Sequence, residues 1–293
     1  MSPRDLILAL FVVTVWGVNF VAIRWGVDEV APLLMTALRY TLAALPAVFF
    51  IRRPAVSWRV LIGYGFAIGV AQFGLLFMSI KLGMPAGLSS LVMQLQAFFT
   101  IGLAVVFLGE RPKPVQWLGA AVAFAGIGVI ATDRLEGAAL VPLLMTIVSA
   151  FFWGVGNIIT KQAGKIDMLG FVVWSSLVPP IPLLALSLLV EGPGAIPEAA
   201  ANLTWIGGGS LLFIAYAATL FGYGIWSMLL SRYPAGLVAP FSLLVPIAGI
   251  GSAALLLGET VSGIEIAGSA LVFAGLLLNV FGPRLLAGRV NPS

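Results

Sequence analysis

Two apolar segments far apart in the chain each carry a tryptophan and an asparagine on the same helical face. Trp16 and Asn19 are three residues apart and Trp153 and Asn157 are four apart, so each pair shares one face of a helix. A ring that stacks and an amide that hydrogen-bonds suit a small molecule with an apolar body and a polar end. The chemistry that these residues predict is recognition of such a molecule.

Other polar and amphipathic residues stand in the middle of apolar segments, where candidates for the lining of a binding site are found. The predicted substrate-binding residues are Trp16, Asn19, Gln72, Phe77, Met78, Gln94, Trp153, Asn157, Tyr223 and Trp226. Gln94 and Gln96 point about 200° away from each other on a helix, so one faces a cavity and the other bonds to a neighbouring helix. Each residue also has a structural alternative, as an interhelical hydrogen bond or, for Trp226, as an anchor at the membrane surface.

The titratable residues exclude most catalytic chemistry. The chain has no histidine and no cysteine, and its acidic residues all lie at the ends of apolar segments or between them. A Ser–His dyad, a pair of carboxylates at membrane depth and a metal site are therefore excluded. We predict a protein that is not an enzyme, with no cofactor, no metal and no proton-coupling group in mid-membrane.

Arg39 is the one charged residue well inside an apolar segment, and the sequence offers it no evident carboxylate partner. We expect its side chain to extend outward to the membrane surface or to bond carbonyl groups at helix ends. The alternative is that Arg39 binds a carboxylate of the substrate.

The elements that position these residues are membrane-spanning helices. Hydrophobic residues make up 61% of the 293 residues and charged residues only 9%, against about 25% charged residues in soluble domains. Windows of roughly 20 apolar residues, enough to cross about 30 Å of hydrocarbon, occur at 5–25, 33–51, 60–81, 85–108, 114–132, 138–161, 168–190, 204–230, 235–257 and 262–282. Within them Gly119, Gly126 and Gly128 are expected at close helix contacts.

The chain is a duplication of one five-helix unit. Pro-Ala-Gly-Leu at 85–88 and Leu-Gly-Glu at 108–110 recur 149 residues later, and Trp16-Gly17 recurs 137 residues later. Such fixed offsets indicate internal repeats, which we place at residues 1–137 and 138–293. The two Leu-Gly-Glu sequences, which contain Glu110 and Glu259, are expected to form capped turns between packed helices, with a coupling role as the alternative.

Five helices is an odd number, so the second unit enters the membrane upside down. Cytoplasmic loops collect lysine and arginine. With a cytoplasmic N-terminus, eleven basic residues lie inside (Arg4, Arg52, Arg53, Arg59, Arg111, Lys113, Lys161, Lys165, Arg232, Arg284 and Arg289) and three outside (Arg24, Lys81 and Arg134). We predict an all-α integral membrane protein with ten transmembrane helices as two inverted five-helix repeats, and with both termini cytoplasmic.

These features resemble the drug/metabolite transporter superfamily, EamA-type. The resemblance rests on Trp-Gly and a basic residue in the first helix of each unit, Ala37-Leu38-Arg39 in the second helix, and Pro-Ala-Gly-Leu and Leu-Gly-Glu around the fourth. Within the superfamily the chain looks similar to YddG-type exporters of aromatic and other neutral amino acids.

The resemblance implies a plasma (inner) membrane exporter that works by alternating access. It also implies a cavity walled by segments 1, 3, 4, 6, 8 and 9, with segments 5 and 10 packed behind. Trp174-Ser175-Ser176 departs from the pattern where Leu-Arg stands in the first unit.

The leading hypothesis is a carrier that exports small amphipathic metabolites, above all amino acids. Aromatic rings with a few amides suit such substrates. The alternatives are export of other compounds, such as nucleosides or amphipathic toxic molecules, a channel, and a passive role in handling lipid. Partners are then a small-molecule substrate and membrane lipid. Nucleic acid is excluded, because the basic residues stand singly at segment ends. We expect a monomer, with a dimer as the alternative.

Overall fold

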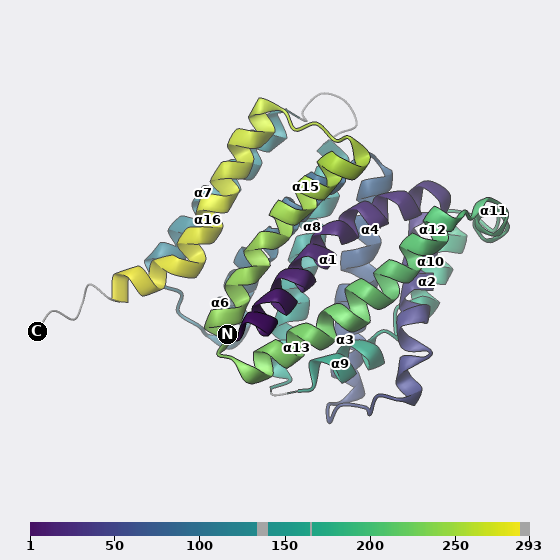
Figure 1. Ribbon diagram of the computed structural model, residues 1–293, viewed down its shortest axis with the longest axis horizontal. Coiled ribbons are helices and arrows are strands. Elements are labelled where there is room, and N and C mark those ends of the chain that lie inside the picture. The colour runs from purple at the N-terminus through teal and green to yellow at the C-terminus, as the bar shows by residue number, and fades with distance from the viewer. Residues whose placement is uncertain (134–139, 165, 288–293) are drawn as a thin grey trace, which may run out of the picture.

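The computed structural model describes residues 1–133, 140–164 and 166–287, and these ranges are almost entirely helical (Figure 1). Within them nine helices are long and apolar enough to cross a membrane, and a bent pair of helices makes up a tenth crossing. The predicted all-α membrane protein with ten spans is confirmed. Each observed span begins and ends within a few residues of its predicted window.

We number the ten crossings as spans 1 to 10. Spans 1 to 5 are α1 (Pro3–Glu29); α2 with η1 (Pro32–Ala44, Ala47–Phe49); α3, η2 and α4 (Trp58–Tyr64, Gly65–Gln72, Phe73–Lys81); α5, η3 and α6 (Ala86–Val92, Met93–Leu95, Gln96–Leu108); and α7 (Pro114–Thr132). Spans 6 to 10 are α8 (Leu140–Gln162); α9 and α10 (Met168–Ser175, Pro180–Val190); α12, η5 and α13 (Trp205–Leu212, Phe213–Phe221, Gly222–Arg232); α14, η6 and α15 (Ala235–Val238, Ala239–Leu244, Val245–Leu257); and α16 (Gly263–Ala287). A short helix, α11 (Ala195–Asn202), lies in the long connection between spans 7 and 8.

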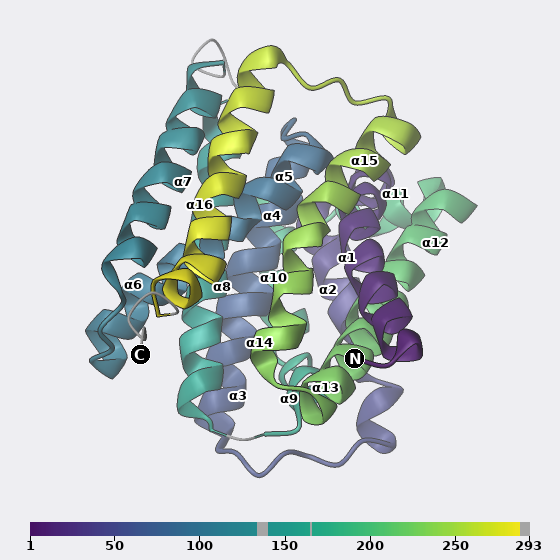
Figure 2. The same ribbon diagram turned by 60° about the vertical axis from the view of Figure 1, so that its left-hand side comes forward.

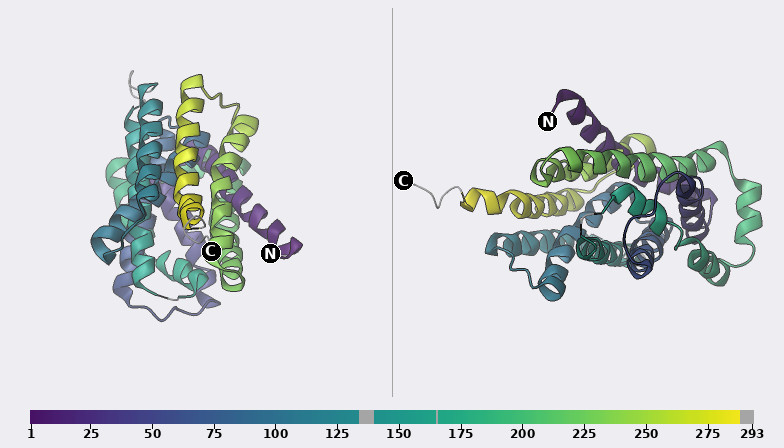
Figure 3. Two further views of the ribbon diagram at one scale, coloured as in Figure 1. Left: turned by 90° about the vertical axis from the view of Figure 1, so that its left-hand side faces the viewer. Right: turned by 90° about the horizontal axis from the view of Figure 1, so that it is seen from below.

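The two halves run through the molecule in opposite senses. Figure 2 shows α1 rising from the N-terminus, whereas α8 descends from the opposite face. The start of α1 and the end of α16 lie on one face (Figure 3, left), which the charge pattern predicts to be cytoplasmic. We call this the predicted inner face and the opposite one the predicted outer face. The boundary predicted between residues 137 and 138 lies outside the described residues.

Both repeats contain a π-helical segment at the same place. The segments are η2 (Gly65–Gln72) in span 3 and η5 (Phe213–Phe221) in span 8. A π-helix bonds residue i to i+5, widens the helix and re-aims the side chains that follow, and such segments are common at functional sites. Because these two lie near the middle of their spans, they mark the membrane centre in each half.

Span 7 is not the straight helix that the window 168–190 predicts. It bends by 41° between α9 and α10. Pro179 and Pro180 cannot donate the backbone hydrogen bonds that would continue the helix, and the hydroxyls of Ser175 and Ser176 both donate to the carbonyl of Val172. The bend leaves both serines at a break in mid-span.

The duplicated Leu-Gly-Glu sequences form the same capped turn in both repeats. Gly109 and Gly258 each adopt a left-handed conformation with φ 65°. The next N–H then bonds six residues back, from Glu110 to Ala104 at 3.2 Å and from Glu259 to Ala253 at 3.3 Å, so each helix ends in a left-handed glycine cap that satisfies a terminal carbonyl. The expected capped turns are confirmed.

Spans 5 and 10 pack against each other at one side of the molecule (Figure 1). A Cβ on Gly126 would lie 2.6 Å from the carbonyl oxygen of Gly268, and one on Gly119 would lie 2.7 Å from that of Gly275. These glycines therefore let the two backbones touch, as expected. Gly128 was expected to do the same, but a Cβ there would meet nothing within 4 Å, because it faces away from α16.

This difference gives a matched pair of substitutions. We expect Gly126→Ala to destabilise the protein by about 1–3 kcal/mol, since the added methyl group meets rigid backbone. Gly128→Ala should leave stability unchanged or raise it slightly, because alanine favours the helix. Thermal unfolding of the two variants in detergent checks this. Equal melting temperatures would contradict the close contact.

Candidate functional site

Arg39 is buried in the membrane-spanning part of the structure. It lies in the middle of span 2 and is only 3% exposed. Its guanidinium carbon lies 4.0 Å from the ring centroid of Phe73 and 4.6 Å from that of Tyr40. The expectation that this side chain reaches the membrane surface or bonds carbonyls at helix ends is wrong, because two aromatic faces hold the cation inside.

The hydrogen-bonding capacity of Arg39 is largely unused. Nη2 donates to the hydroxyl of Thr219, in span 8, at 3.1 Å. Nε and Nη1 are buried and have no hydrogen-bond partner among the described residues. Unpaired buried donors are costly, more so when charged. Arg39 therefore has donors left for a further hydrogen-bonding group.

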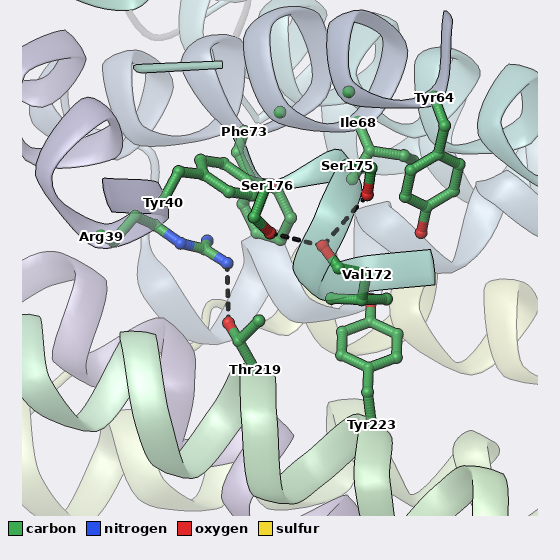
Figure 4. A pocket seen from close by; sticks show the side chains of 12 residues that line it. Arg39, Tyr40, Tyr64, Ile68, Phe73, Val172, Ser175, Ser176, Thr219 and Tyr223 are labelled. Carbon is green, nitrogen blue, oxygen red and sulfur yellow. Dashed lines mark hydrogen bonds between the residues drawn. The ribbon is translucent and has the colours of Figure 1, made fainter. Parts of the chain in front are cut away.

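A pocket lies beside Arg39 (Figure 4), and the space between its lining atoms, counted together with the part that is open to solvent, is about 290 Å³. Spans 2 and 3 of the first repeat and spans 7 and 8 of the second form its wall. The described residues that line it are Arg39, Tyr40, Tyr64, Gly65, Ile68, Gly69, Phe73, Val172, Ser175, Ser176, Thr219 and Tyr223. Each repeat thus contributes two matching helices to one space.

The two π-helical segments and the bend of span 7 meet at this pocket. Gly65 and Gly69 belong to η2, and Thr219 belongs to η5, where its hydroxyl also donates to the carbonyl of Ile214 five residues back. A Cβ on Gly65 would lie 2.6 Å from Cβ of Val178, and one on Gly69 would overlap the ring of Pro179. Span 7 can therefore place its break against span 3 only because these two residues are glycine.

Arg39 and Ser176 occupy equivalent positions in the two repeats, 137 residues apart. Both line the pocket, from spans 2 and 7, and Figure 4 shows their side chains facing the same space. The two residues therefore stand at equivalent positions in the two repeats but differ in chemistry. Arg39 places a cation at the pocket and Ser176 places a hydroxyl there. The site is polarised, with its positive charge at one end.

Of the predicted site residues, Tyr223 lines this pocket directly. Trp16 lies behind Tyr223. The centroid of its ring is 5.5 Å from that of Tyr223 and 5.2 Å from that of Trp226, and its indole N–H donates to the carbonyl of Ala218 in η5 at 2.9 Å. Trp16, Tyr223 and Trp226 thus form one aromatic cluster. Phe77 is fully buried, with its ring centroid 5.7 Å from the guanidinium carbon of Arg39.

The structure places the other predicted residues outside the lining of this pocket. Asn157 donates to the side chains of Gln96 and Thr100, at 2.7 and 3.0 Å. Of the two glutamines, Gln96 is thus the one that bonds to a neighbouring helix. Gln94, Gln72 and Asn19 are buried, and the amide oxygen of Asn19 lacks a partner among the described residues. Half-buried Met78 and Trp153 pack against apolar clusters.

The walls of the pocket also differ from those implied by resemblance, which were segments 1, 3, 4, 6, 8 and 9. Spans 3 and 8 are shared, whereas spans 2 and 7 supply the charge and the hydroxyls. One signal in the sequence indicates Gly65 and Gly69: a pair of small residues four apart in an apolar helix marks a close helix contact. Tyr40, Tyr64 and Phe73 carry no such signal, because aromatic residues are frequent throughout apolar helices.

Two inverted five-helix repeats around a shared mid-span pocket define a membrane carrier. Residues 4–132 and again 140–281 match the EamA-like transporter family. The chain belongs to this family, and the resemblance found in the sequence is confirmed.

The relatives extend over almost the whole chain. It is 46% identical over 291 residues to a probable amino-acid metabolite efflux pump of Salmonella typhimurium and 44% identical over 290 residues to one of Escherichia coli, with 97% of each chain covered in both cases. It is 28% identical to a probable terminal-alkyne amino-acid exporter of Streptantibioticus cattleyicolor, covering 95% of this chain and 93% of the relative. A solved structure, 18% identical, covers 100% of both chains with a TM-score of 0.66, which supports the fold.

Proposed function

We propose that this protein is a secondary transporter that exports amino-acid metabolites by alternating access through the pocket at Arg39. The observation that carries the proposal is a mid-span pocket to which each repeat contributes two equivalent helices, because carriers built from inverted repeats bind substrate at the repeat interface near the midplane. The names of the relatives at 44–46% identity support the substrate class. The side chains of aromatic and other neutral amino acids fit the lining, in which Tyr64, Ile68 and Phe73 provide apolar surface.

The proposal includes the cellular setting. The protein would lie in the plasma (inner) membrane with both termini cytoplasmic, act without a cofactor and work as a monomer. The basic residues on the predicted inner face support this orientation. Export then moves substrate from the predicted inner face to the predicted outer face, and no enzymatic step is involved.

Counterflow in proteoliposomes tests the function. Vesicles loaded with unlabelled phenylalanine should accumulate labelled phenylalanine transiently, and a panel of other neutral amino acids should compete. Vesicles that contain a variant with a blocked pocket should behave like empty vesicles. If neither amino acids nor their metabolites exchange while nucleosides or amphipathic cations do, the proposed substrate class is wrong.

Contacts on the predicted outer face support alternating access. Three carboxylates there each bind the start of a helix in the other repeat. Glu29 accepts from the backbone and hydroxyl of Thr204, Glu191 from the backbone N–H groups of Leu33 and Leu34, and Glu259 from those of Ala86 and Gly87, at distances of 2.6 to 3.2 Å. Carboxylates satisfy the free N–H groups and the positive dipole at helix starts. We call these three residues the outer clasp.

The symmetry-related contacts on the predicted inner face are different. Glu110 is the counterpart of Glu259, and it forms an ion pair with Lys161, in which both side chains are exposed. Arg24 is the counterpart of Lys161, and it pairs instead with Asp28 at 3.2 Å. Because inverted repeats can exchange their arrangements, we propose that in the second state Glu259 releases α5 and Glu110 binds the start of α14.

Opposite effects of two alanine substitutions are therefore expected. Glu259→Ala removes two charge-assisted hydrogen bonds, each worth about 1.5–3 kcal/mol, and should shift the protein about tenfold or more toward the outward-open state. Glu110→Ala should shift the protein the other way. In the present state it loses only an exposed ion pair, which contributes about 0–1 kcal/mol, whereas in the second state it would lose the hydrogen bonds to the start of α14. The measurement is the rate at which an impermeant thiol reagent outside vesicles labels a cysteine introduced at Ser175. Glu198→Ala, on exposed α11, is the control, and equal rates in all variants would contradict the exchange.

A further inference from the structure

The pocket contains a positive charge with no negative charge to balance it. Arg39 is buried, and no aspartate or glutamate occurs among the described residues that line the pocket. The carboxylates of the outer clasp lie at the helix ends and already accept hydrogen bonds from helix starts. An empty pocket therefore keeps an unpaired cation inside the membrane, which is unfavourable until an anion arrives.

The free donors of Arg39 define the group that binds there. A guanidinium presents five N–H donors in a planar fork, and Thr219 uses only Nη2. Nε and Nη1 remain unpaired among the described residues. Each of them, together with the second N–H of Nη2, forms a pair of donors that matches the two oxygens of a carboxylate. The rings of Phe73 and Tyr40 fix the guanidinium plane, so the fork is already oriented.

The other polar groups of the pocket are poorly suited to an ammonium group. The hydroxyls of Ser175 and Ser176, which donate to the carbonyl of Val172, offer an ammonium group only uncharged acceptors, and no carboxylate stands beside them. An amino acid in its zwitterionic form would bring a second cation into a pocket that already contains Arg39. A molecule with a carboxylate and no ammonium would neutralise the site completely.

We propose, on the basis of the proposed function, that Arg39 binds the carboxylate of the substrate and that the site prefers monocarboxylates of net charge −1 to zwitterionic amino acids. Metabolites in which the amino group is absent or acylated belong to this class. Tyr64, Ile68, Val172 and Phe73 receive the apolar body. Amides and amines with the same body are excluded, because they cannot neutralise Arg39.

Three probes with one apolar body separate the possibilities. They are 3-phenylpropionate (charge −1), phenylalanine (zwitterion) and phenylalaninamide (charge +1), and binding to the purified full-length protein is measured by calorimetry. We expect 3-phenylpropionate to bind about tenfold more tightly than phenylalanine, and phenylalaninamide not to bind. Tighter binding of phenylalanine than of 3-phenylpropionate would overturn the preference for a net anion.

Substitutions of Arg39 test its assigned role. Arg39→Gln should abolish the discrimination among the three probes, and Arg39→Lys should keep their order with weaker binding, because lysine retains the charge without the fork. The lysine variant also keeps the test valid if the glutamine variant fails to fold. Arg59→Gln, at an exposed position on the predicted inner face, is the matched control. Unchanged discrimination in both Arg39 variants would overturn the role of Arg39 while leaving the proposed export intact, whereas absence of binding and counterflow for every probe and metabolite would overturn the function itself.

Discussion

Replacing Gly69 with alanine is expected to reduce transport by about tenfold to a hundredfold. The added methyl group would overlap the ring of Pro179, and a proline ring has little freedom to move. Overpacking of this kind costs about 1–3 kcal/mol, which corresponds to that range of rates or affinities. The contact lies between η2 and the break in span 7, so relief of the overlap displaces one wall of the pocket.

Gly63→Ala is the matched control for this experiment. Gly63 lies in the same span, six residues before Gly69, and a Cβ there would come no closer than 3.7 Å to Ile159. Counterflow is measured for both variants, together with the elution profile of each in detergent. A Gly69→Ala protein that elutes normally and transports at the wild-type rate would show that span 7 does not need this close contact.

Replacing Trp16 with alanine is expected to reduce transport by a similar factor. Trp16 touches both Tyr223 and Trp226, and its N–H bonds the backbone of η5 at Ala218. Loss of this partly buried ring costs up to about 1.5–3 kcal/mol, and here it also frees Tyr223, which lines the pocket. Trp16→Phe, which keeps a ring and loses the hydrogen bond to Ala218, should have an intermediate effect.

Two other tryptophans complete this test. Trp153 is the counterpart of Trp16 in the second repeat, and its replacement by alanine is expected to lower transport as well. Trp117, in peripheral α7, is 51% exposed, so Trp117→Ala should have little effect. Counterflow and the amount of protein in the membrane are measured for each variant. Normal transport by the Trp16 variant with loss in the Trp117 variant would place the site elsewhere.

The spans and their pairing into repeats are predictable from the sequence for a simple physical reason. Twenty apolar residues suffice to cross the hydrocarbon, and duplicated sequences reveal equivalent helices without any knowledge of packing. The Leu-Gly-Glu turns follow from local chemistry, because only glycine adopts a left-handed cap without strain. The bend of span 7 is less evident, because a window of mean hydropathy does not distinguish a straight helix from one interrupted at Pro179.

The pocket depends on structural features that cannot be predicted from the sequence. The π-helical segments η2 and η5 change which face each residue presents, and their apolar composition is the same as that of an α-helix. Asn157 illustrates the consequence, since its amide bonds to Gln96 and Thr100 across a helix contact. Arg39 likewise has its partners, Phe73 and Thr219, on spans 3 and 8, so their proximity arises only from the fold.

The most direct test of the central claim is the accessibility of a single cysteine in the pocket wall. The natural chain contains no cysteine, so Ser175→Cys introduces the only thiol with little change in volume. Alternating access through this pocket predicts that impermeant thiol reagents label Cys at this position from either side of the membrane, and that a transported amino-acid metabolite slows labelling from both. A cysteine at Gly128, where the structure shows open space outside the pocket, should be indifferent to substrate. Labelling at position 175 from one side only, or labelling that no metabolite slows, would contradict the account.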